Sequence, residues 1–237
     1  MGKKGKCTYC RKFSDNLTVD HVFAGSWYPA NTPQTVQRWT VRACFKCNNE
    51  LSDVEEYLFL RLSRQLNPQN PLFQDLIVRA HRAVDPSAAT DPKDRIARQK
   101  KLDQLNADVV QMTGVDPKKT FPSLNQPASS VGLRFSKAMS DRFQEKVVRG
   151  ASLKLYNRVI DPPAGIRLYN VHASDVVGDA AFLDARLSSW EIGEGFEVAH
   201  GQAADDDQVL IFRITIWGVY RFYALVAPQG FEDQPDE

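Results

Sequence analysis

Alternating apolar and polar positions near the start of the chain predict a β-hairpin. Residues 17–22 alternate in this way and are typical of a short strand. Residues 38–43 are expected to return as its partner, because Thr40 and Val41 favour β structure. A loop containing Asn31-Thr-Pro33 separates the two segments. The six residues at the N-terminus are expected to form a flexible tail.

Helical spacing follows the hairpin. Leu51, Val54, Leu58 and Leu62 recur at intervals of three and four residues, which predicts a helix with one face on a core. Ser52-Asp-Val-Glu55 is also a capping-box pattern. The sequence therefore leaves open whether one helix runs on from Cys47 or a new helix starts at Ser52. Further helices are expected at residues 72–84, 91–112 and 135–156.

After Pro162-Pro163 the pattern changes to short alternating segments. We expect a short helix at 180–187, and we interpret Asp205-Asp206-Asp207 as a solvated turn rather than a metal site. The last two predicted strands flank Gly218 and indicate a tight antiparallel hairpin. The expected strands are 166–171, 196–200, 208–217 and 219–227.

These elements predict an α+β fold in three parts. Residues 1–66 would form an N-terminal module stapled by zinc, 67–131 a helical connector, and 132–237 a small antiparallel sheet with helices. The boundary is placed in the Pro- and Ser-rich connection from Val115 to Val131. The sequence assigns no activity to the third part, which could position substrate, bind a regulator, dimerise or complete the core beneath the first.

Composition indicates a soluble globular protein. Of 237 residues, 43% are hydrophobic and 25% are charged. The most apolar stretch, Val209 to Trp217, is short and contains Arg213, so we expect no membrane segment. The cysteines occur as two close pairs, which favours metal binding in a reducing compartment over secreted disulfides. The expected location is the cytoplasm.

Charge is distributed unevenly along the chain. The net charge is +5 over residues 1–50 and −10 over residues 161–237, although the whole chain carries only +1. A basic front attracts a phosphate backbone through counterion release. The alternative is that its Lys and Arg residues solvate a loose terminus. The acidic rear would stay off nucleic acid, free to meet a protein partner or a second copy of the chain.

All four cysteines lie in two CxxC pairs, Cys7-Thr-Tyr-Cys10 and Cys44-Phe-Lys-Cys47. Each pair lets two thiolates converge on one ion, and two pairs complete a closed tetrahedral site. The spacing therefore predicts a structural zinc ion held by these four residues.

The first fifty residues also carry an ordered set of motifs. CTYC is followed by NLTVDHV and then by CFKCNNE. This order resembles the HNH endonuclease (ββα-metal, treble-clef zinc knuckle) family, and the resemblance leaves the rest of the chain unexplained. It implies a β-hairpin and a helix that grip one divalent cation opposite a catalytic histidine.

The resemblance also implies site roles. His21 would be the general base that activates water, and Asp20 and Asn48 would hold a catalytic metal, Mg²⁺ or Mn²⁺. Because neighbouring strand residues face opposite sides, Asp20 and His21 reach one phosphate only if the strand ends or bends there. The family's middle Asn is replaced by Trp39, so the residue that orients the histidine is not identified.

The expected function is hydrolysis of DNA phosphodiester bonds by a metal-dependent endonuclease, with RNA left open as a substrate. The alternative is a non-catalytic zinc finger of the treble-clef type that binds nucleic acid or a protein. A small module offers little surface for reading bases, so the basic residues are expected to contact phosphates. The expected contact residues are Lys3, Lys4, Lys6, Arg11, Lys12, Arg38, Arg42 and Lys46.

Overall fold

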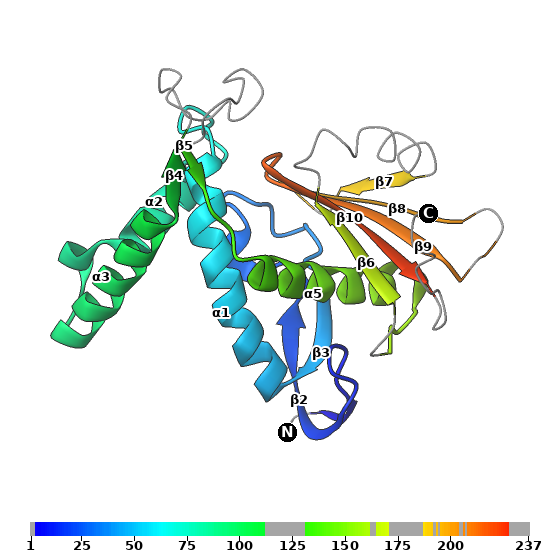
Figure 1. Ribbon diagram of the computed structural model, residues 1–237. Coiled ribbons are helices and arrows are strands. Elements are labelled where there is room, and N and C mark those ends of the chain that lie inside the picture. The colour runs from blue at the N-terminus through cyan, green and yellow to red at the C-terminus, as the bar shows by residue number, and fades with distance from the viewer. Residues whose placement is uncertain are drawn as a thin grey trace, which may run out of the picture.

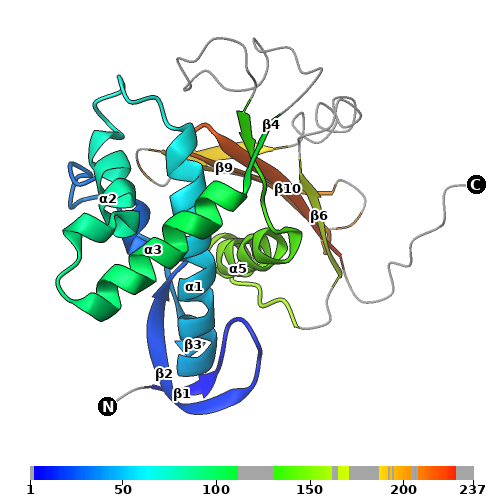
Figure 2. The ribbon, with the colours of Figure 1, turned by 60° about the vertical axis from the view of Figure 1, so that its left-hand side comes forward.

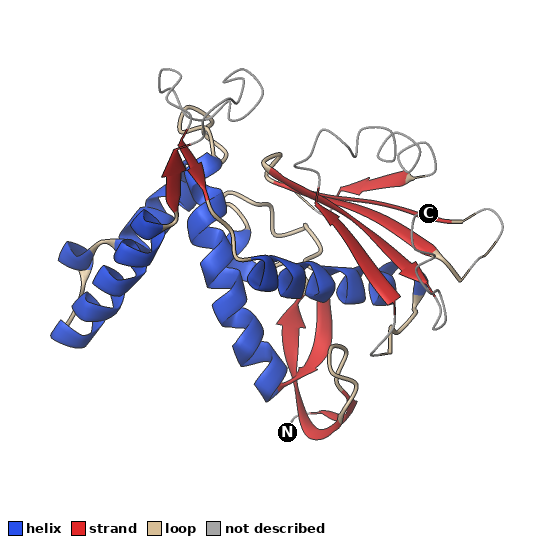
Figure 3. Ribbon diagram, in the orientation of Figure 1, coloured by secondary structure: helices blue, strands red, loops and turns tan. Residues whose placement is uncertain are grey.

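A computed structural model describes residues 3–111, 131–161, 165–170, 187–191, 193, 195–203, 206 and 208–227. Most of the expected helix at 180–187, the Pro-rich connection and the three-aspartate turn lies outside these residues. The chain is mixed α/β; its described residues form three antiparallel sheets, and some of the helices lie between the two larger ones (Figures 1 and 3). No helix in the described part is both long and apolar enough to cross a membrane.

The N-terminal sheet has three antiparallel strands in the order β1-β2-β3. Their bounds are β1 (Lys3–Lys6), β2 (Phe13–His21) and β3 (Thr40–Cys44). The predicted hairpin is thus present, but the predicted tail is wrong for β1, whose Lys6 pairs with Phe13 of β2. The tight turn between β1 and β2 explains this pairing, because the amide of Cys7 donates to the carbonyl of Lys12 at 3.0 Å.

One helix, α1 (Phe45–Leu62), follows β3 directly. Cys44 is its N-cap residue, so the capping-box pattern at Ser52 starts no second helix. The predicted apolar face is confirmed, because Leu51, Val54, Leu58 and Leu62 are all buried. α1 therefore joins the second cysteine pair to the core.

The middle of the chain contains α2 (Gln74–Val84) and α3 (Pro92–Ala107). The side chain of Asp91 caps α3 by accepting from the amide of Asp94 at 2.8 Å. The helix expected at 91–112 ends early, because β4 (Val109–Gln111) leaves it to pair with β5 (Val131–Leu133). Single 3₁₀ turns lie at Gly25–Trp27, Ser63–Gln65 and Pro86–Ala88.

The C-terminal sheet is antiparallel with the order β6-β10-β9-β8-β7. The hairpin predicted around Gly218 is confirmed. Trp217 and Gly218 both have positive φ, of 52° and 71°, which matches the right-handed twist of the strands. β7 was not expected. The strands are β6 (Gly165–Asn170), β7 (Ser188–Glu191), β8 (Phe196–Gln202), β9 (Leu210–Ile216) and β10 (Tyr220–Ala227).

Helix α5 (Lys137–Tyr156) lies beside α1 and beneath the C-terminal sheet (Figures 1 and 2). The ring of Trp27 stacks on Phe143 of α5 at 5.0 Å and lies 5.2 Å from Trp217. One hydrophobic cluster therefore includes residues from both ends of the chain. The three-part division stays a prediction, but its first and third parts share this core.

Candidate functional site

The two cysteine pairs come together in space. Cys7 and Cys10 lie on the turn between β1 and β2, and Cys44 and Cys47 lie at the start of α1. Their four sulfur atoms lie within 4.8 Å of one another, and Sγ of Cys10 is 3.9 Å from Sγ of Cys44. Four thiolates around one zinc ion stand about 3.8 Å apart, given a Zn–S bond of about 2.3 Å. The cluster could therefore hold a structural metal such as zinc.

The backbone around the cluster supports this geometry. The amide of Tyr9 donates to Sγ of Cys7 at 3.4 Å, as amides beside a thiolate commonly do. Arg11 closes the turn in the left-handed region, with φ of 61°. Cys7 is fully buried, while the other three cysteines are half-buried. The site is thus built by one turn and one helix start, as the spacing predicted.

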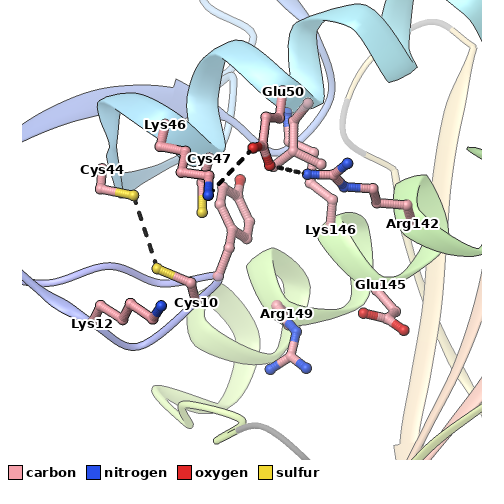
Figure 4. Close-up of a pocket in the computed structure, with 12 residues that line it drawn as sticks. Cys10, Lys12, Cys44, Lys46, Cys47, Glu50, Arg142, Glu145, Lys146 and Arg149 are labelled. Carbon is pink, nitrogen blue, oxygen red and sulfur yellow. Dashed lines mark hydrogen bonds and ion pairs between the residues drawn. The ribbon is translucent and has the colours of Figure 1, made fainter.

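A pocket of about 380 Å³ lies beside the cysteines, between α1, α5 and the turn that carries Cys7 and Cys10, which we call the first knuckle (Figure 4). Glu50 accepts from Arg142 and lies 3.8 Å from Lys46, so one carboxylate serves two cations. Lys146 lines the same pocket, and its ammonium group contacts the carboxylates of Asp20 and Glu55 behind the pocket.

Asp20 and His21 face opposite sides of the hairpin. Asp20 pairs across the sheet with buried Val41, and only 7% of its surface is exposed. His21 is the last residue of β2, pairs with Thr40 and is half-buried. The strand ends at His21, as a shared phosphate contact would require, but the two side chains do not converge on one open position.

The Asp20 carboxylate is fully engaged. Its Oδ2 accepts from the hydroxyl of Tyr9 at 2.5 Å and lies 3.0 Å from Nζ of Lys146. Lys146 also contacts Glu55 of α1, and its side chain is only 1% exposed. Burial raises the pKa of Glu55, and the ammonium of Lys146 opposes that rise. The four side chains form one buried charge cluster.

Sequence reasoning missed three members of this cluster. Glu55 was interpreted as a possible cap, and neither Tyr9 nor Lys146 was singled out. The available signal was small: Glu55 falls one turn after Leu51 on the same helix, so it faces the core side. Lys146 lies 91 residues from Glu55 along the chain, and no local pattern identifies that pairing.

The imidazole of His21 is half-buried. Burial lowers its pKa below 6.5, Arg38 and Lys146 lower it further, and Asp20 opposes them. The ring is therefore mostly neutral at pH 7 and can accept a proton. Within the described ranges neither ring nitrogen has a hydrogen-bond partner, so no described residue orients the ring through a hydrogen bond. Trp39, at the position of the family's middle Asn, is buried in the core.

Asn48 lies in the first turn of α1, on the face of the hairpin that carries Asp20. Its amide donates to Oγ1 of Thr18 at 3.0 Å, and Thr18 donates to the carbonyl of Ala43. Asn48 and Asp20 thus belong to separate hydrogen-bonding groups. Of all His, Cys, Asp and Glu residues that are described, only the four cysteines form a cluster suited to a metal.

The catalytic metal implied by the resemblance does not fit these side chains as they stand. A divalent ion needs open oxygen ligands, but both oxygens of Asp20 already contact Lys146. The ammonium of Lys146 occupies the position beside Asp20 where a metal cation would be expected. A metal could bind Asp20 only after Lys146 had moved away.

The eight basic residues expected to contact nucleic acid occupy different surroundings. Lys4 lies 3.2 Å from Asp15, Lys46 pairs with Glu50, and Arg38 stacks over the ring of Tyr28 at 4.8 Å. Lys12 lines the pocket beside the cysteines, while Lys3 lies on β1. The structure places the other three, Lys6, Arg11 and Arg42, around a second pocket.

No protein-family model, curated protein or solved structure matches this chain. The resemblance to HNH endonucleases therefore rests on the residues of the first fifty positions alone.

Proposed function

We propose that the chain is an endonuclease that hydrolyses phosphodiester bonds of DNA, with His21 as the general base. The observation that carries the proposal is the position of His21. His21 is the last residue of β2, the central strand of the N-terminal sheet. A metal bound by the four cysteines would fix this sheet to α1. Burial also lowers the pKa of the His21 imidazole. A neutral, half-buried imidazole can take a proton from water that reaches it.

The chain's own residues support specific parts of the reaction. His21 would accept the proton of the attacking water at a ring nitrogen. Gly25 lies beside the ring, where a Cβ would make an ordinary van der Waals contact with the imidazole at 3.9 Å. The cysteine cluster and α1 would hold β2 and β3 in register, so that the histidine keeps its place relative to the substrate.

The proposal includes a divalent cation, Mg²⁺ or Mn²⁺, on Asp20 and Asn48 only in a state where Lys146 has left Asp20. Lys146 belongs to α5, so such a state needs a shift of this helix or of the lysine side chain.

The buried charge cluster around Asp20 favours a second function. Because Asp20 is buried and paired with Lys146 and Tyr9, the hairpin and α1 could serve as a non-catalytic zinc-stapled module that binds nucleic acid or a protein. In this account Asp20 would only dock α5, and His21 would have no chemical role.

Incubating the purified protein with supercoiled plasmid and Mg²⁺ or Mn²⁺ separates the two functions. Cleavage that EDTA abolishes supports the endonuclease. Plasmid binding without any nicking, over a range of divalent-ion concentrations, supports the binding module and contradicts the nuclease. Zinc content is measured before and after EDTA treatment, so that loss of the structural ion is not mistaken for loss of a catalytic one.

A further inference from the structure

A second pocket, of about 440 Å³, lies where the first knuckle, β3 and the end of α5 meet. Four basic side chains from separate parts of the chain surround it. We call this set the basic groove: Lys6 at the end of β1, Arg11 of the knuckle, Arg42 of β3 and Lys154 of α5. Lys154 was not among the residues expected from the sequence.

The groove differs in charge from the pocket beside the cysteines. No Asp or Glu is among the described residues that line it. Lys6, Arg42 and Lys154 have no carboxylate within 4 Å in the described part of the chain, whereas Arg11 pairs with exposed Asp161 at 2.7 Å. In the other pocket, Glu50 offsets Lys46 and Arg142. The groove therefore keeps unneutralised positive charge.

Strand pairing places this groove next to His21. Val19 pairs with Arg42, and His21 pairs with Thr40, in successive rungs of the same ladder. Directly paired residues share a face, and residues two apart along a strand share it too. Val19, Thr40 and Arg42 line the groove, and so does Val41, the partner of Asp20. His21 thus shares a face of the hairpin with three of the groove's four hairpin residues, and Asp20 is on the other face with Val41.

We propose that the basic groove binds the phosphodiester backbone of the DNA strand that His21 attacks. This inference rests on the proposed nuclease function and adds the path of the strand, along the outer face of the hairpin and past the end of α5. It also gives the C-terminal part of the chain a share in substrate binding through Lys154. Lys12 and Lys46, beside the cysteines, lie off this path.

Equilibrium binding of a fluorescent 30-base-pair duplex tests the groove. All measurements use the full chain with His21→Ala, so that DNA stays intact. Lys154→Gln and Arg42→Gln should each weaken binding about eightfold at 0.1 M salt and lower the log–log salt slope by about 0.9, the effect of one lost phosphate contact. Lys137→Gln is the control on the same helix, and Lys93→Gln, at an exposed position of α3, is the second control.

The proposed role of the groove is contradicted if the Lys154 and Arg42 variants, with unchanged thermal unfolding, bind DNA as tightly as the two controls. The proposal is also contradicted if polyglutamate displaces the labelled duplex as effectively as unlabelled DNA does, because the groove would then bind any polyanion. Failure of the nuclease proposal looks different: groove variants of the parent chain lose DNA affinity, while the parent chain itself never cleaves DNA.

Discussion

The ammonium of Lys146 lies 3.0 Å from Oδ2 of Asp20, although 126 residues separate the two along the chain. Their side chains are 1% and 8% exposed, so water does not screen the pair. This contact fixes α5 over the face of the hairpin that carries Asp20, whereas His21 belongs to the opposite face.

Removing Lys146 should destabilise the fold strongly. Lys146→Met leaves Asp20 and Glu55 buried without a compensating cation, which costs about 3–5 kcal/mol. Lys137→Met, on the same helix with a side chain 85% exposed, should change the free energy of unfolding by less than about 0.5 kcal/mol. Urea unfolding measures both. Equal stabilities for the two variants would contradict the buried cluster.

Asp20→Asn tests whether this carboxylate also serves catalysis. If a divalent ion binds Asp20 once Lys146 has moved, the variant should need a higher Mg²⁺ concentration for half-maximal plasmid cleavage, because one ligand is weakened. The measurement is a Mg²⁺ titration at a temperature where the variant is folded. If the half-maximal Mg²⁺ concentration is unchanged while the variant unfolds more easily, Asp20 serves only to hold α5 against the hairpin.

The cysteine cluster should bind one zinc ion per chain. Cys44→Ser should lose the metal and lower the melting temperature, because a structural zinc ion contributes its binding free energy to folding. Elemental analysis and thermal unfolding give the two readings, and Asn16→Ala, at an exposed position of β2, is a neutral control. Zinc-free protein with an unchanged melting temperature would refute the metal site.

Much of the N-terminal module could be predicted from sequence, because its signals are local. CxxC spacing indicated the cysteine cluster, and alternation indicated that β2 ends near His21. The charge cluster could not be predicted, since Tyr9, Asp20, Glu55 and Lys146 come from four separate segments. A lysine at position 146 is an ordinary helical residue until tertiary packing buries it.

The sequence pattern was ambiguous at the start of α1, where two possible helix starts lie close together. Ser52 to Glu55 matches a capping box, but the first turn of α1 is already fixed by Cys44 and Cys47. The helix therefore runs through Ser52, and Glu55 faces Lys146 instead of its own backbone. Strand β1 was missed because Lys3–Lys6 has no apolar alternation, and its pairing depends on the turn that brings Cys7 and Cys10 together.

Cleavage should depend on pH through His21. Burial lowers the pKa of this imidazole below 6.5, and Arg38 lowers it further. The neutral form is the base, so the rate should be level near pH 7–8 and fall only as pH drops through the lowered pKa. Arg38→Gln removes one cation and should move that fall to higher pH. A pH–rate profile for kcat checks both expectations, with Arg95→Gln on exposed α3 as the control. An identical profile for the parent and Arg38→Gln would argue against His21 as the general base.

The most direct test of the account compares His21→Ala with His81→Ala in plasmid cleavage with Mg²⁺. His81 is an exposed histidine on α2, so its loss controls for the substitution itself. We predict that His21→Ala slows cleavage about 10²–10⁴-fold, while zinc content, melting temperature and DNA affinity stay close to those of the parent. His81→Ala should cleave like the parent. Equal cleavage by both variants would show that His21 is not the base and would contradict the proposed active site.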